Sequence, residues 1–435
     1  MNALPRRITL LQNATLPDGS TCDVLLDGDT VAAVSPAHSF ATGEAHAEAH
    51  TAARATPHAA DDATLDLTGF LLLTAPADPH SHLDKALSWD AIDPPMGDLV
   101  SAILAWRAYA ATMTTESIVE RARAAALLML RQGTTAVRSH VDILLGDDPL
   151  RGARALVQVR DELRGLMDIE LVALAGSDVP DADIEAAIDL GIDLVGGSPH
   201  LALDPGHDLR RLLRLAERKG VGVDIHTDEN LTGALTLAEF AREVRDWPAD
   251  RNRSAGHCVR LGTLALDDLS DVLDEVEASN VGIISNPITN LYLQGWEHPV
   301  SMPRGLTAAR AVLDRGIRFA AGADNVRDPF NPVGRSDALE TASLLVIAGH
   351  LTLDEAYTAV ADGARDVMAL PKAGATVGAR AEFLAIRATN LSDAVANASA
   401  DRYVIHAGNL VAQSTVSYSV AEPTPARHPS LLETR

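Results

Sequence analysis

The stretch GFLLLTAPADPHSHLDK, residues 69–85, joins an apolar run to two histidines that lie one residue apart. The run 69–73 is typical of a buried strand. Residues i and i+2 of an extended chain point to the same face, so His80 and His82 are expected to direct their imidazole rings toward one point in space. This arrangement suits a metal ion if further ligands come from other parts of the chain.

Three more apolar runs end in the same way, at side chains that can bind a metal ion or carry a proton. Residues 221–225 precede His226 and Glu229, residues 254–256 precede His257, and residues 317–323 precede Asp324.

Four of these side chains form a suitable ligand set for one zinc or ferrous ion, with an open position for water. They are His80, His82, His226 and Asp324. A bound divalent cation lowers the pKa of water and supplies hydroxide near neutral pH. Glu229 is then placed to carry a proton, and Asp324 is able to take one from the water. We expect His257 to hydrogen-bond the hydroxide or the developing oxyanion.

The pattern from about residue 68 to 368 is an apolar strand, a polar turn and an Ala- and Leu-rich helix, repeated many times. Repeated βα units favour a closed parallel barrel, whose chemistry gathers at the carboxyl ends of its strands. The candidate ligands follow such strand ends. Expected strands include 135–138, 170–174, 194–196 and 282–285, and expected helices include 115–131 and 209–219.

Both ends of the chain carry strand signals of a different kind. Residues 7–36 alternate short apolar runs with turn-forming residues, which is typical of a small antiparallel sheet. Strand signals return at 382–386, 402–406 and 410–411. We therefore predict an α/β fold in which a TIM-like (β/α)8 barrel, residues 68–368, carries a small β-sandwich domain built from residues 1–67 and 369–435. Within these ends, residues 37–63 are expected to form an exposed excursion and the tail from about 421 to be loosely ordered.

Composition excludes several classes of function. The formal net charge of −24 argues against a nucleic-acid ligand, because such binding rests on a basic surface that neutralises phosphates. A small neutral or cationic substrate fits this charge better. Two cysteines are too few for a disulfide framework, and no apolar stretch reaches the roughly 20 residues that span a bilayer. We therefore expect a cytoplasmic enzyme that does not insert into membranes.

Seven short motifs follow one another at the expected strand ends. They are Asp78–Lys85 (DPHSHLDK), Val137–Asp142 (VRSHVD), Gly196–His200 (GGSPH), Asp224–Glu229 (DIHTDE), Gly256–His257 (GH), Asn286–Gly295 (NPITNLYLQG) and Gly322–Phe330 (GADNVRDPF). In this order the motifs resemble those of the amidohydrolase superfamily. Within it they are most similar to the cytosine deaminase branch and to enzymes that act on aminotriazine rings, such as N-isopropylammelide amidohydrolase. The resemblance covers nearly the whole chain.

The resemblance implies a hydrolytic deaminase. In such an enzyme, hydroxide adds to an amidine-type ring carbon, the residue that matches Glu229 protonates the ring nitrogen, and ammonia leaves. By position, the four ligands named above would bind the metal ion, and Glu229 and His257 would be catalytic.

Two departures from the cytosine deaminase pattern concern the substrate. A substrate-binding glutamine is replaced here by the segment around Gly176, and a second aspartate is replaced by Asn325. Asparagine both donates and accepts hydrogen bonds, so the substrate edge is expected to differ from that of cytosine. Relatives that remove substituted amines from triazines are similar at Lys85 and Asn325, so Lys85 is expected to contact a ring carbonyl or an anionic substrate. Candidates for the pocket wall are Phe330, Trp89 and Leu83.

Two reactions stay open: release of ammonia from a cytosine-like ring, and release of a substituted amine from a triazine-like ring. A non-catalytic binding protein has weak support, because no proposed ligand or proton carrier is missing. Binuclear relatives bridge two metal ions with a carboxylated lysine on a mid-barrel strand, and the only lysines here are Lys85, Lys219 and Lys372. One metal ion, zinc or iron, is therefore favoured. The partner would be a small heterocycle, and the resemblance is compatible with a homo-oligomer.

Overall fold

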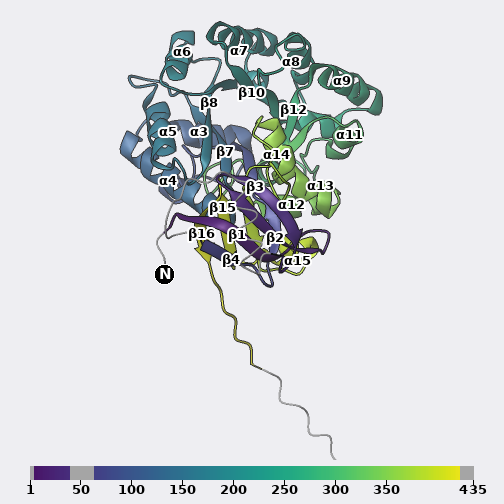
Figure 1. Ribbon diagram of the computed structural model, residues 1–435. Coiled ribbons are helices and arrows are strands. Elements are labelled where there is room, and N and C mark those ends of the chain that lie inside the picture. Colours follow the sequence, from purple (N-terminus) through teal and green to yellow (C-terminus); the bar gives the residue numbers. More distant parts are fainter. Residues whose placement is uncertain (1–3, 40–62, 422–435) are drawn as a thin grey trace, which may run out of the picture.

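The computed structural model describes residues 4–39 and 63–421 (Figure 1). The expected excursion over 37–63 and the expected loose tail therefore fall almost entirely outside the described residues. None of the described helices is both long and apolar enough to cross a bilayer.

The larger unit is a barrel of eight parallel strands in the order β6 to β13. The chain closes the ring where Ser81 and Asp324 form a parallel bridge between the first and last strands. This confirms the predicted TIM-like barrel. The strands are β6 (Ala77–Ser81), β7 (Ala136–Asp142), β8 (Asp168–Ala175), β9 (Leu194–Gly197), β10 (Gly222–Thr227), β11 (Arg253–His257), β12 (Gly282–Ser285) and β13 (Phe319–Ala321).

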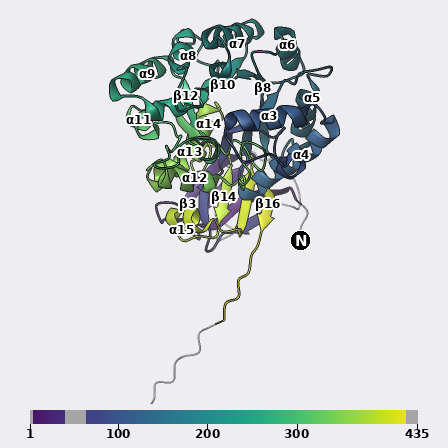
Figure 2. The same cartoon turned by 180° about the vertical axis from the view of Figure 1, so that it is seen from behind.

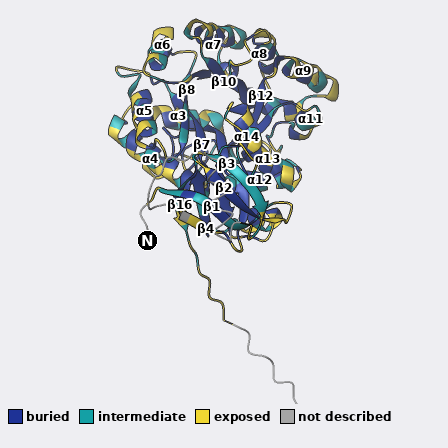
Figure 3. Cartoon of the chain, viewed as in Figure 1, coloured by how far each residue is buried: buried dark blue, intermediate teal, exposed yellow. Residues whose placement is uncertain are grey.

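The barrel strands are buried on both faces because helices cover the outside of the ring (Figures 2 and 3). Every residue of β9 and β10 is buried, as expected for parallel strands that read as continuous apolar runs. Gly196 in β9 allows close packing, because a Cβ atom there would lie 2.6 Å from Val172 Cγ1 and 2.7 Å from the Asp224 carbonyl oxygen.

The helices surround the barrel or extend its strand ends. They are α2 (Trp89–Ile92), α3 (Leu99–Ala110), α4 (Thr115–Gln132), α5 (Arg151–Glu162), α6 (Asp181–Asp189), α7 (Pro205–Lys219), α8 (Leu237–Glu243), α9 (Leu266–Ser279), α10 (Pro287–Leu293), α11 (Ala309–Asp314), α12 (Ala338–Ile347), α13 (Leu353–Val360), α14 (Asp362–Val367) and α15 (Leu391–Asn397), with short 3-10 turns at Pro199–Leu201 and Val259–Thr263.

Helix α7 shows how local sequence sets these boundaries. The Asp204 side chain accepts a hydrogen bond from the backbone N–H of His207, and Pro205 occupies the first turn, where its missing N–H costs nothing. Gly220 ends the helix at φ +70°, a left-handed conformation that glycine adopts without strain. The buried positions recur at spacings of three and four residues, at Leu209, Leu212, Leu213 and Ala216.

A second sheet, built from both chain ends, confirms the predicted separate β domain. Its order is β16-β15-β14-β5-β1-β2-β3, with β4 beside β1, and β1 also pairs with β16. Its strands thus belong to one continuous sheet that folds back on itself. They are β1 (Arg6–Thr15), β2 (Thr21–Asp27), β3 (Thr30–Pro36), β4 (Ala63–Asp66), β5 (Leu71–Thr74), β14 (Phe383–Ile386), β15 (Arg402–His406) and β16 (Asn409–Ser414).

The apolar run 69–73 differs from its sequence interpretation. It does not lead into the histidines as part of a barrel strand, because Leu71–Thr74 form β5, which pairs with β14 and β1 in the small sheet. The barrel strand that carries His80 begins at Ala77. Both sheets bury this part of the chain, so hydrophobicity alone could not assign the run to one of them. The division of the chain at 67/68 and 368/369 stays a proposal.

Two arginines, one of them buried, join the two units. The guanidinium of Arg402, on β15, donates to the Asp337 carboxylate at 2.8 Å and to the Gln132 carbonyl at 2.5 Å, at the end of α4. Arg380, just before β14, pairs with Asp168 of β8 at 2.7 Å. These charge-assisted contacts fix the small sheet against the barrel on the side of its helices and strand starts.

Candidate active site

The candidate ligands meet at the carboxyl ends of the barrel strands. His80 lies in β6 and His82 directly follows it, His226 lies in β10, and His257 is the last residue of β11. Asp324 follows β13 and is tied to β6, because its N–H donates to the His80 carbonyl at 2.9 Å. All of these side chains are buried. The structure thus brings together the residues that the sequence predicted to form one site.

The ring nitrogens and the carboxylate are close enough to share one ion. His82 Nε2 lies 3.3 Å from His226 Nε2 and 3.2 Å from Asp324 Oδ1, and His80 Nε2 lies 3.7 Å from Asp324 Oδ1. The ligand atoms of His80, His82 and His226 all lie within 4.8 Å of one another, as do those of His80, His257 and Asp324.

The donor set fits a divalent cation by its chemistry as well. Both ring nitrogens of His80, Nδ1 of His226 and both carboxylate oxygens of Asp324 are buried without a hydrogen-bond partner among the described residues. Burial lowers the pKa of His80, His82 and His226 well below the usual value, so the rings are neutral, as metal ligands must be. Burial also raises the pKa of Asp324. A cation bound to one ring nitrogen of each histidine and to Asp324 would satisfy part of this set, including the carboxylate oxygens, and would favour the ionised carboxylate.

Three residues near the carboxyl ends of the barrel strands have a left-handed backbone conformation. Asp228, His257 and Asp324 have φ values of 52°, 67° and 58°. Such values are uncommon for residues other than glycine, and they gather at functional sites where the surrounding structure enforces them. The Asp228 carboxylate shows one such restraint, since it accepts hydrogen bonds from the backbone N–H of Thr236 at 2.7 Å and of Leu237 at 3.1 Å.

Glu229 and His257 form a contact pair beside the ligands. Glu229 Oε1 lies 3.2 Å from His257 Nδ1, and Asn290 Nδ2 lies 3.1 Å from the same oxygen and 3.0 Å from the same nitrogen. Burial alone would lower the pKa of His257, but the carboxylates of Glu229 and Asp324 outweigh it and raise the pKa to about 9. Gln294, one turn after Asn290, donates to the Glu229 carbonyl at 3.0 Å. Helix α10 therefore holds both the side chain and the backbone of Glu229.

A buried network supports the ligands from behind. Arg138 of β7 donates to Asp224 Oδ2 at 2.7 Å and to Glu170 Oε2 at 2.5 Å. The other oxygen of Asp224 lies 3.5 Å from His140 Nε2 and 3.9 Å from His80 Nδ1. Burial opposes the ionisation of Asp224, yet the hydrogen bonds from His140 and Arg138 lower its pKa to about 2. This carboxylate therefore places a negative charge near Nδ1 of His80, whose other nitrogen faces Asp324.

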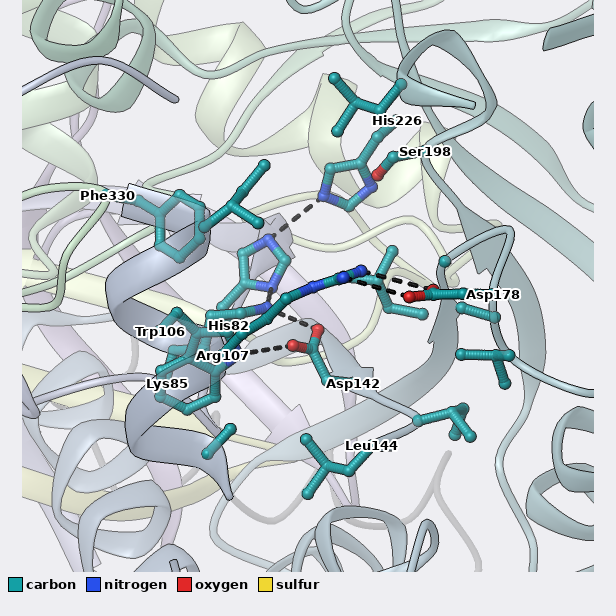
Figure 4. A pocket seen from close by; sticks show the side chains of 18 of the residues that line it. His82, Lys85, Trp106, Arg107, Asp142, Leu144, Asp178, Ser198, His226 and Phe330 are labelled. Atoms are coloured by element: carbon teal, nitrogen blue, oxygen red, sulfur yellow. Dashed lines mark hydrogen bonds and ion pairs between the residues drawn. The ribbon is translucent and has the colours of Figure 1, made fainter. Parts of the chain in front are cut away.

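The Lys85 ammonium group has two polar neighbours within the protein. Its ammonium donates to Asp142 Oδ1 at 2.7 Å and lies 3.1 Å from His82 Nδ1 (Figure 4). Asp142 Oδ2 accepts the indole N–H of Trp106 at 2.6 Å. Lys85, Asp142 and Trp106 thus form one polar chain beside His82.

A cavity of about 440 Å³ opens onto these groups. Glu229, His257 and Asp324 line it, and so do the three other residues that the sequence predicted to contact substrate, Gly176, Asn325 and Phe330. Asn325 Nδ2 donates to Asp328 Oδ2 at 2.8 Å. Trp89 and Leu83 are not among the described residues that line the cavity, and Trp106 supplies the indole wall instead.

The sequence interpretation missed several residues of the site. Asp142 and Asn290 lie within two of the seven motifs. Their sequence positions therefore indicated that they belong to the site, but not which groups they contact. Trp106 lies on α3 outside all seven motifs, and only the fold brings it to Asp142, 36 residues later.

Comparison with known proteins agrees with this geometry. The sequence model of the amidohydrolase family matches residues 168–412, more than half of the chain. The chain belongs to the amidohydrolase family. This confirms the resemblance drawn from the motifs.

Curated relatives of this amidohydrolase include two enzymes with heterocyclic substrates in their names. A pterin deaminase from Rhizobium rhizogenes is 28% identical over 354 residues, which cover 79% of this chain and 80% of the relative. The N-isopropylammelide isopropyl amidohydrolase of a Pseudomonas species is 22% identical over 377 residues, which cover 81% of this chain and 88% of the relative.

Solved structures of similar shape include two further amidohydrolase-like enzymes. The 5-methylcytosine deaminase of Klebsiella pneumoniae, liganded with 5-fluorocytosine, has a TM-score of 0.81 at 25% identity and covers 95% of this chain and 99% of its own. The N-isopropylammelide isopropylaminohydrolase of Burkholderia multivorans has a TM-score of 0.77 at 26% identity and covers 94% of this chain and 98% of its own.

Proposed function

We propose that this amidohydrolase is a metal-dependent hydrolytic deaminase that removes the amino group of a nitrogen heterocycle and releases ammonia. One observation carries the proposal: a contacting carboxylate and imidazole, Glu229 and His257, lie beside a set of unsatisfied metal-binding atoms at the closed end of a cavity. This arrangement supports a reaction in which a bound ion and two proton carriers act on the same ring carbon.

The ion would be held by His80, His82, His226 and Asp324, and zinc and iron both suit these donors. When bound, a divalent ion lowers the pKa of water and makes hydroxide available near neutral pH. We assign the proton transfers to side chains of the chain itself.

The hydrolysis needs two proton transfers, and the contacts suggest how they are divided. Water adds to the amidine carbon, a ring nitrogen takes a proton, the C–NH2 bond breaks, and the amine leaves with a second proton as ammonia. Glu229 Oε1 is the group we assign to these transfers, because it lines the cavity and is held by Asn290 at 3.1 Å. His257 Nε2 is buried without a hydrogen-bond partner among the described residues and is assigned to the oxygen of the attacking water.

The relatives support a deaminase over other amidohydrolase reactions. The pterin deaminase and the 5-methylcytosine deaminase are both named for loss of an amino group from a ring. A small neutral heterocycle is also the partner that the acidic composition favours. A cytoplasmic location and a homo-oligomeric state stay predictions.

A second reaction, release of a substituted amine from a triazine-like ring, is favoured by one specific observation. Lys85 and Asn325, the positions at which the sequence resembles triazine-directed enzymes, both line the cavity, and two relatives are N-isopropylammelide hydrolases.

Product analysis separates the two reactions. Metal-loaded protein is incubated with cytosine, isoguanine, creatinine, pterin and ammelide-type triazines, and ammonia and alkylamines are measured in the same samples, with a chelator-treated control. Metal-dependent ammonia from one ring supports the deaminase. An alkylamine from N-isopropylammelide without ammonia from any ring would replace it with the second reaction.

A further inference from the structure

The cavity continues well beyond the titratable groups at its closed end. Its outer part lies between α3 and the loops that follow β7 and β8, and it is lined by residues that have no role in the proposed chemistry. In Figure 4 the side chain of Arg107 extends toward Asp178, between the histidines and Leu144. We refer to the space lined by Leu99, Ile103, Leu144, Val179 and Leu201 as the outer chamber.

The five residues that define the outer chamber have hydrocarbon side chains. Two of the five lining residues come from α3, two from the loops after β7 and β8, and one from the 3-10 turn after β9. The Trp106 indole lines the same cavity, and its N–H donates to Asp142, which also lines it. Apolar lining residues favour an apolar occupant, because binding removes hydrocarbon surface of both the ligand and the protein from water.

The two arginines at the chamber do not supply a free charge. Arg107 pairs with Asp178 at 3.1 Å, with both side chains about half exposed. The guanidinium of Arg151 donates hydrogen bonds to two backbone carbonyl groups, that of Asp148 at 3.1 Å and that of Ala110. The two guanidinium groups beside the outer chamber are therefore paired or hydrogen-bonded, even though the chain as a whole carries a net charge of −24.

The size of the cavity also exceeds what one ring requires. Its volume of about 440 Å³ lies within the range of roughly 300–1,000 Å³ that encloses drug-sized ligands. A six-membered ring that reacts at Glu229 would leave the outer chamber to water.

We propose that the outer chamber binds an apolar part of the substrate, either a second fused ring or a hydrocarbon substituent, and that the enzyme prefers amino-heterocycles larger than a single ring. This inference rests on the proposed function, because it names the substrate class of the same site. Burial of a phenyl-sized group in such a chamber strengthens binding about 10- to 100-fold.

The test compares matched ligands in matched variants. Rates of ammonia release and calorimetric binding are measured for cytosine, for 5-benzylcytosine and 6-benzylcytosine, and for bicyclic pterin. Ile103→Trp fills the chamber from α3. Leu104→Trp places the same ring on the next residue of the helix, which is 65% exposed and lies outside the cavity. Ala111→Trp, an exposed lining residue at the end of α3, fills the chamber without replacing a packed side chain.

The wild-type protein should bind at least one extended ring 10-fold or more tightly than cytosine. Ile103→Trp and Ala111→Trp should abolish this preference, and Leu104→Trp should keep it. Equal binding of all four ligands, or equal effects of Ile103→Trp and Leu104→Trp on binding, would overturn the inference even if ammonia is released. Tighter binding of an extended ring without any ammonia would support the chamber and refute the deaminase, so the two failures are distinct.

Discussion

Removal of the Asn290 amide should slow the reaction strongly while the protein stays folded. Asn290 is buried on α10, and its Nδ2 lies 3.1 Å from Glu229 Oε1 and 3.0 Å from His257 Nδ1. It is thus the one amide among the described residues that touches both proposed proton carriers. If Glu229 must be held at a fixed place in the cavity, loss of this donor releases it.

The size of the effect follows from these contacts. A hydrogen bond to a charged group contributes about 1.5–3 kcal/mol. Each 1.36 kcal/mol of transition-state stabilisation changes a rate about tenfold. Asn290→Ala should therefore lower kcat roughly 10- to 160-fold, and KM should change less, because the lost contact orients a proton carrier and not the bound ring.

The assay is steady-state ammonia release with the ring that the wild-type protein turns over best. Asn290→Asp is a second variant, which replaces a donor with a carboxylate beside Glu229 and should also be slow. Tyr292→Phe is the matched control, since its hydroxyl lies on the outer side of α10, 3.4 Å from the N–H of Gly97, and its rate should equal that of the wild type. A folded Asn290→Ala protein with a kcat within threefold of the wild type would refute the assigned role of the amide.

Three further predictions concern metal binding, pH and stability. Lys85→Met should bind zinc more tightly in a chelator competition, because an ammonium 3.1 Å from His82 Nδ1 repels a cation on the same ring; weaker binding would show that Lys85 supports the site. Burial lowers the pKa of His200 from 6.5 to about 4. Between these two pH values only the unfolded chain binds a proton at this residue. The free energy of unfolding therefore falls as the pH drops below 6.5, by at most about 1.4 kcal/mol per pH unit. In urea titrations of metal-free protein, His200→Gln should reduce this slope; equal slopes in the wild-type and variant proteins would contradict the assignment. Arg138→Met leaves the buried carboxylate of Asp224 and the partly exposed carboxylate of Glu170 without their guanidinium and should cost about 3–5 kcal/mol of unfolding free energy, measured by denaturant; a loss below 1 kcal/mol would contradict the network.

The barrel was predictable because its signals are local. Each of His226 and His257 follows a short apolar run, and a parallel strand that is buried on both faces produces such a run. The ends of parallel strands meet at one side of the barrel, so residues far apart in the sequence could be placed in one site without knowledge of the helices between them.

The apolar run 69–73 shows where local signals fail. Its three leucines, residues 71–73, are buried in β5, in the small sheet and not in the barrel. A run of Leu residues satisfies either sheet equally, and the choice depends on pairing with β14, more than 300 residues later. No pattern within the run contains this information.

The contacts of the site were less predictable than its members. Glu229 and His257 could be selected by type and position, whereas the role of Asn290 depends on how α10 packs against two other loops. Lys85 lines the cavity, so its contact with substrate stays a prediction, but its pairing with Asp142 at 2.7 Å could not be predicted from the sequence. Trp106 enters the site from a helix with no recognisable motif, because only tertiary packing places its indole beside Asp142.

The most direct test of the central claim is a metal titration of stripped protein. Chelator-treated protein is titrated with zinc or ferrous ion while ammonia release from an amino-heterocycle is followed, and bound metal is measured in the same samples. We predict that the rate of ammonia release rises from zero to a maximum at one ion per chain, and that Glu229→Gln binds the same ion without releasing ammonia. Ammonia release that survives complete removal of the metal, or that requires two ions per chain, would contradict it.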